Sequence, residues 1–135
     1  MTFTTPCFVR VENPEKRKEL IEWLCGIGRP HRKVIPLDVF PFIVAYDGWH
    51  DNVSMESLKV YQEKIPGLID CGENIELFKA LAAMNYENYR EQWFVEEGRM
   101  FKCTSDKINN YSYNWLTTRK ATAEEIVEYF KNKEL

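Results

Sequence analysis

The stretch that decides the fold is FPFIVAYDGWHDN, residues 40–52. Residues 40–46 are mostly apolar and predict an extended strand. Asp47–Gly48 is a dipeptide that favours the tight turn of a β-hairpin, and we expect a short return strand through Trp49. Pro41 places the first strand at a sheet edge or at a strand start, because proline donates no hydrogen bond to a ladder.

Upstream of this hairpin, the alternation in CFVRV (7–11) predicts another strand. A helix is expected next, because Asn13 is a good N-cap and Pro14 fits the first helical position. Gly26 and Gly28 are expected to end it. A second extended segment is predicted at 34–37.

Downstream, the same kinds of signal recur. Capping residues precede apolar stripes of helical period, and glycine-containing turns separate them. The expected elements are a helix at 55–64 capped by Ser54, a strand at 68–71, a helix capped by Asn74, a hairpin at 92–103 that turns near Glu97 and Gly98, and a last helix opened by a capping box of Thr122 and Glu125.

The predicted order is strand, helix, hairpin, helix, encountered twice. It indicates an α+β fold in which helices pack on a mainly antiparallel sheet. We expect one compact domain over 1–135, with internal halves at 1–65 and 66–135 as candidate tandem units. The spacing between corresponding caps differs along the chain, so a true duplication and generic α+β patterning both stay open.

The composition describes a globular protein with a mildly acidic surface. Hydrophobic residues make up 44% of the 135, and the net charge is −3. A general nucleic-acid binder would normally be basic. No apolar run approaches the ~18 residues of a membrane span, and the first twenty residues show no secretory signal. The scattered cysteines are expected to be reduced, which indicates the cytoplasm; they are Cys7, Cys25, Cys71 and Cys103.

The first candidate binding feature is an aromatic row. Tyr111, Tyr113 and Trp115 occupy alternate positions, so a strand would present all three on one face. Tyr and Trp are common interface anchors, and this row is our leading candidate for a protein- or ligand-binding surface. The alternative is that the row packs against a helix as part of the core.

The second candidate is the basic loop RPHRK (29–33). Arg29, Arg32 and Lys33 could hold a phosphate or an acidic partner, with salt-dependent affinity. Together with the aromatic row they define a second hypothesis, a nucleic-acid-associated protein. The alternative is an ordinary solvated loop, which the acidic balance of the chain favours.

The third candidate is the hairpin turn itself, where Asp47, His50 and Asp51 could serve a small hydrolase-like enzyme. However, adjacent residues of a strand face opposite sides, so His50 and Asp51 are not expected to converge. The chain has no closely spaced metal-ligand pair and no Gly-rich cofactor or nucleophile motif. We therefore name no catalytic residue, metal or cofactor.

Three phrases together resemble small proteins of phages and prophages of gut Bacteroidales, a group with no assigned activity. They are TPCFVRVENPEKRKEL (5–20), IDCGENIELFKALAAM with QWFV (69–84 and 92–95), and RKATAEEIVEYF (119–130). The resemblance implies a short accessory protein in a bacterial cytoplasm. It carries over no catalytic residue.

The leading hypothesis is therefore a non-enzymatic cytoplasmic accessory protein, phage or mobile-element encoded, that acts by protein–protein interaction. Its partner is expected to be a protein, with nucleic acid as the second hypothesis and no membrane. A self-pairing edge strand would make a homodimer, which the sequence neither requires nor excludes.

Overall fold

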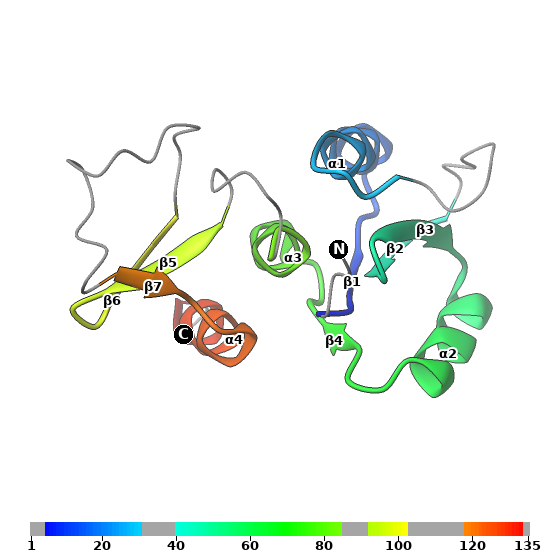
Figure 1. Ribbon diagram of the computed structural model, residues 1–135. Coiled ribbons are helices and arrows are strands. Elements are labelled where there is room, and N and C mark those ends of the chain that lie inside the picture. The colour runs from blue at the N-terminus through cyan, green and yellow to red at the C-terminus, as the bar shows by residue number, and fades with distance from the viewer. Residues whose placement is uncertain (1–4, 31–39, 85–91, 103–117, 134–135) are drawn as a thin grey trace.

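Two β-sheets lie on either side of one central helix, α3 (Figure 1). The structure is a computed structural model that describes residues 5–30, 40–84, 92–102 and 118–133. Its strands are β1 (Cys7–Arg10), β2 (Phe42–Tyr46), β3 (Trp49–Val53), β4 (Ile69–Asp70), β5 (Trp93–Glu96), β6 (Arg99–Lys102) and β7 (Thr118–Lys120). Its helices are α1 (Pro14–Gly26), α2 (Met55–Lys64), α3 (Ile75–Ala82) and α4 (Ala123–Lys133).

The first sheet has the strand order β3-β2-β1-β4. β2 is antiparallel to both β1 and β3, whereas β4 pairs with β1 in parallel. The second sheet has the order β6-β5-β7, and both of its pairings are antiparallel. The α+β class predicted from the sequence is confirmed.

Both predicted hairpins form, and the backbone explains why. Asp47 and Gly48 have φ values of 47° and 82°, which is the pair of positive φ angles that a type I′ turn requires. Glu97 and Gly98 repeat this geometry, with φ values of 49° and 79°. The expectation that the first return strand stops near Trp49 is wrong. β3 continues to Val53 because the ladder with β2 runs its full length.

The predicted caps also form. The Asn13 side chain accepts from two backbone N–H groups at the start of α1, and Ser54 and Asn74 cap α2 and α3 in the same way. Thr122 and Glu125 bond to each other's backbone N–H groups. These local bonds satisfy donors that the first turn of a helix leaves free.

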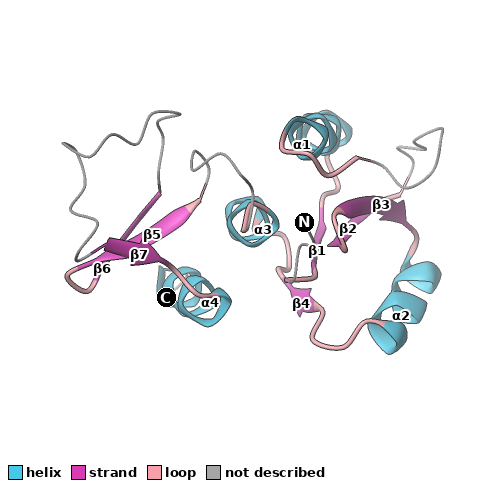
Figure 2. Ribbon diagram, in the orientation of Figure 1, coloured by secondary structure: helices cyan, strands magenta, loops and turns pink. Residues whose placement is uncertain are grey.

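The helices cover both faces of the first sheet (Figure 2). Side chains such as Cys7, Val9 and Ile43 pack with α1 and α3 on one face. The alternate residues Phe8 and Val44 pack with α2 on the other face, in a smaller cluster. Because side chains alternate along a strand, neighbouring residues pack against helices on opposite faces of the sheet.

The core on the α1 and α3 face continues into the second sheet. Phe78 and Leu81 of α3 belong to the same buried cluster as Ile126 of α4 and Val95 of β5. Trp93 of β5 is a further aromatic contact, with ring centroids 5.2 and 5.3 Å from the two aromatic rings of α4, those of Tyr129 and Phe130. One apolar cluster therefore contains residues from both candidate halves.

The order of elements recurs along the chain, but the strand pairing does not. β4 opens the second half in sequence, yet it pairs with β1 of the first sheet. The second hairpin instead pairs with β7, which comes after it. The two halves are therefore not equivalent in topology. The extended segment predicted at 34–37 lies outside the described residues.

Candidate functional site

Most of the binding residues expected from the sequence fall outside the described parts of the chain. They are Tyr111, Tyr113, Trp115, Arg32 and Lys33. Their roles stay predictions. Arg29, Asp47, His50 and Asp51 are described, and their positions decide what the first hairpin can do.

Arg29 lies in the interior instead of in a solvated loop. Its side chain is completely buried, and its Nε donates to the carbonyl oxygen of Ala82 at 3.0 Å. A longer bond of 3.5 Å reaches the carbonyl of Trp49. Burial lowers the pKa of Arg29 to about 10, although the neighbouring Cys7 and Asp47 act in the opposite direction. The guanidinium thus joins the end of α3 to the edge strand β3 and is enclosed away from a phosphate in solution.

His50 and Asp51 point to opposite faces of β3, as the sequence predicts. His50 is fully buried on the Arg29 side, where its Nδ1 donates to the Arg29 carbonyl at 2.7 Å. Asp51 faces α2 and accepts hydrogen bonds from Tyr61 of α2 and from Tyr46 of β2. The two groups therefore do not form the Asp–His pair that a hydrolase-like site would need.

Asp51 is the centre of a polar cluster beneath the surface. It is 2% exposed, and its Oδ2 accepts hydrogen bonds from Tyr46 at 3.0 Å and from Tyr61 at 2.5 Å. The two tyrosine rings lie 5.5 Å apart. Burial and the bond to Asp51 raise the pKa of Tyr61 above its ordinary range. One carboxylate thus fixes two aromatic rings from different elements, β2 and α2.

Trp49 adds an exposed ring beside this pair. It lies directly opposite Tyr46 in the β2–β3 register, and it shares the strand face of Asp51, two residues along. Trp49 is 45% exposed. We call Tyr46, Trp49 and Tyr61 the aromatic surface. Sequence reasoning missed it, although the Asp47–Gly48 turn already sets Tyr46 across from Trp49.

Exposed apolar side chains concentrate around the same elements. Among the residues that the structure describes, the large hydrophobic side chains with high exposure are Trp49 of β3 and Met55 and Val60 of α2, with 45%, 54% and 46% of their surface exposed. A folded protein tolerates single exposed apolar residues. Of these three residues, Trp49 is the one that lies opposite Tyr46 in the strand register, so we take Trp49, and not Met55 or Val60, as the candidate contact residue.

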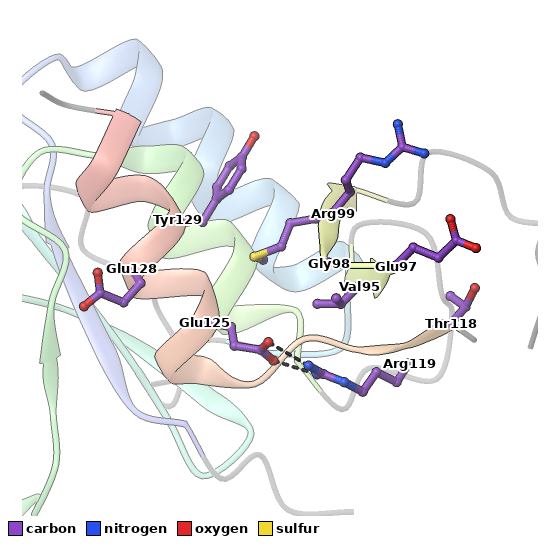
Figure 3. Close-up of a pocket in the computed structure, with 10 residues that line it drawn as sticks. Val95, Glu97, Gly98, Arg99, Thr118, Arg119, Glu125, Glu128 and Tyr129 are labelled. Carbon is purple, nitrogen blue, oxygen red and sulfur yellow. Dashed lines mark hydrogen bonds and ion pairs between the residues drawn. The ribbon is translucent and has the colours of Figure 1, made fainter. Parts of the chain in front are cut away.

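A cleft of about 870 Å³ lies between the second hairpin and α4 (Figure 3). At its base Arg119 donates two hydrogen bonds to Glu125, at 2.6 and 2.8 Å. These bonds, with the Thr122 backbone N–H, lower the pKa of Glu125 to about 2. Because the same carboxylate closes the capping box of α4, we assign this pair a structural role.

Two further depressions border the turn between β4 and α3. One, of about 690 Å³, is lined by this turn and by α4. The other, of about 460 Å³, runs between α2 and the β1–β4 side of the first sheet. We call the latter the α2 groove. Asp70, Gly72 and Glu73 line both depressions.

Neither metal-binding nor membrane-spanning features emerge from the described ranges. Their His, Cys, Asp and Glu side chains form no group of three or more that could hold a metal ion. No helix in these ranges is long and apolar enough to cross a membrane. Comparisons with protein-family models, curated proteins and solved structures found no match to this chain.

Proposed function

We propose that this chain is a non-enzymatic accessory protein, encoded by a phage or mobile element, that acts in the bacterial cytoplasm by binding another protein. The aromatic surface is the observation that carries the proposal. It combines an exposed tryptophan with two tyrosines whose hydroxyls share one buried carboxylate. Trp and Tyr are the residue types enriched at the energetic centres of protein interfaces.

The Asp51 bonds give this surface a further property that favours binding. Ordering a free side chain on association costs about 0.5–1.5 kcal/mol. Tyr46 and Tyr61 are already held by Asp51 in the unbound protein, so much of that cost is met on folding. Their rings can then contact a partner without a large entropy loss.

The cysteines support the cytoplasmic part of the proposal. The described ones, Cys7, Cys25 and Cys71, are free thiols. Cys7 and Cys71 lie buried within hydrogen-bonding contact of each other, and this contact raises the pKa of Cys71. Neighbouring thiols that stay unpaired are expected in a reducing compartment.

Affinity capture from nuclease-treated bacterial lysate tests the proposal. The test variant is Trp49→Ala, and the matched control is Val60→Ala, because Val60 is exposed to nearly the same degree. We expect a protein partner that wild type and the Val60 variant retain and the Trp49 variant loses. Far-UV circular dichroism confirms that each variant is folded.

The other outcomes separate the alternatives. Capture that vanishes with nuclease would favour the nucleic-acid hypothesis, which now depends on Arg32, Lys33 and the aromatic row at 111–115. Equal capture by all three forms would refute the aromatic surface as the binding site.

A further inference from the structure

The α2 groove exists because α2 covers only part of one sheet face. α2 packs against β2 and β3, and the described residues leave a groove between α2 and the β1–β4 side of this face. Phe8, Phe42 and Leu58 form a buried apolar floor. Met55 stands at the rim with 54% of its surface exposed. The described residues therefore leave Met55 exposed at the rim of a groove with an apolar floor.

The two walls of the groove carry opposite charges. Lys59 belongs to the α2 wall, and Asp70 and Glu73 belong to the opposite wall. Within the described residues, the side chains of Lys59 and Glu73 form no hydrogen bond and no ion pair. By contrast, Arg10, which also lines the groove, is already bound to Glu12 at 2.6 Å. One unpaired cation and one unpaired anion thus face each other across an apolar floor.

This arrangement is self-complementary. In a twofold dimer both subunits use the same patch. If a residue of one copy contacts a second residue of the other copy, the reverse contact also forms. A twofold axis along the groove sets the acidic wall of one copy against the α2 wall of the other. Each wall then faces a wall of opposite charge on the other copy.

We propose that the occupant of the α2 groove is a second copy of this chain, with Lys59 of each copy facing Glu73 of the other. The groove lies on the β1–β4 side of α2, separate from the aromatic surface, so this inference goes beyond the proposed function. Its small area makes the dimer weak and concentration-dependent. The net charge of −3 opposes association at long range, so the local pairs supply the orientation.

Sedimentation equilibrium over a wide concentration range tests the dimer with the purified chain. Wild type is expected to shift from monomer to dimer as its concentration rises. Lys59→Glu and Glu73→Lys each turn two attractive contacts into two repulsive ones, and each is expected to weaken the dimer at least about tenfold. An equimolar mixture of the two variants should restore it, because every contact in the mixed dimer regains opposite charges.

Matched controls come from α1. Lys18→Glu and Glu22→Lys make the same changes at exposed positions outside the groove, and both are expected to leave dimerisation unchanged. Circular dichroism checks folding. A monomer at every concentration would overturn the proposal, as would charge variants that dimerise like wild type or a mixture that stays monomeric. A failed dimer would leave the capture result with Trp49→Ala unaffected.

Discussion

Removing one hydroxyl group, in Tyr61→Phe, tests the role of the buried Asp51 carboxylate. The substitution keeps the ring and deletes the hydroxyl with its 2.5 Å bond to Asp51 and its weaker contact with the Tyr46 hydroxyl. A hydrogen bond to a charged group contributes about 1.5–3 kcal/mol to stability. Tyr61 is partly exposed, so water can hydrogen-bond to its hydroxyl in both the folded and the unfolded state. We therefore expect a loss near the lower end, about 1.5 kcal/mol.

The pH dependence of this loss follows from the raised pKa of Tyr61. A group whose folded pKa is raised contributes stability that is complete below its unfolded pKa, near 10.0 for tyrosine. That contribution disappears as the pH rises beyond this value toward the folded pKa. The difference in unfolding free energy between wild type and Tyr61→Phe should therefore be constant at neutral pH and shrink above about pH 10.

Urea denaturation followed by far-UV circular dichroism measures both effects. Tyr46→Phe removes the longer bond, at 3.0 Å, and is expected to be the milder change. In a double-mutant cycle, Asp51→Asn and Tyr61→Phe should be less than additive because they weaken the same bond. A loss below about 0.5 kcal/mol for Tyr61→Phe, within the range of ordinary surface changes, would refute the claim that Asp51 holds the two rings.

Further changes at three positions probe the interior, a helix cap and a turn. Arg29→Ala should cost about 2–5 kcal/mol in urea unfolding, as for other large buried truncations, and Arg29→Met should cost less because it refills the space; equal costs would contradict a packing role. Thr122→Ala should cost about 1 kcal/mol. The contribution of the Glu125 carboxylate to stability should be complete above about pH 4.5 and should disappear as the pH falls toward about 2. Thermal melts across that pH range would show this loss. Gly48→Ala places a side chain at φ 82° and should cost about 1 kcal/mol; an unchanged denaturation midpoint would argue against the type I′ turn.

The parts of this fold that sequence reasoning predicts are those set by neighbouring residues. Asp47–Gly48 requires positive φ angles that only a few residue types adopt easily, so the hairpin can be inferred from two letters. Asn13, Ser54 and Asn74 accept from N–H groups two or three residues away. In each case, both partners of the interaction lie within a few positions of each other in the sequence.

Other features depend on contacts between distant segments. Arg29 is part of a basic sequence, but its carbonyl partner in Ala82 comes 53 residues later, so local charge gives no sign of its burial. The parallel pairing of β4 with β1 likewise depends on how α1 and α3 pack on the sheet. Tyr61 reaches Asp51 only because α2 folds back over β3. No periodic pattern in the sequence indicates these long-range contacts.

The central claim is that the aromatic surface binds a protein. The most direct test is the dissociation constant of the captured partner for wild type, Trp49→Ala and Val60→Ala, measured by isothermal titration calorimetry. An interface hot spot contributes 2 kcal/mol or more, which is about a 30-fold change in affinity. We predict at least that weakening for the Trp49 variant and less than about twofold for the Val60 variant. A Trp49 variant that binds as tightly as wild type would contradict the claim.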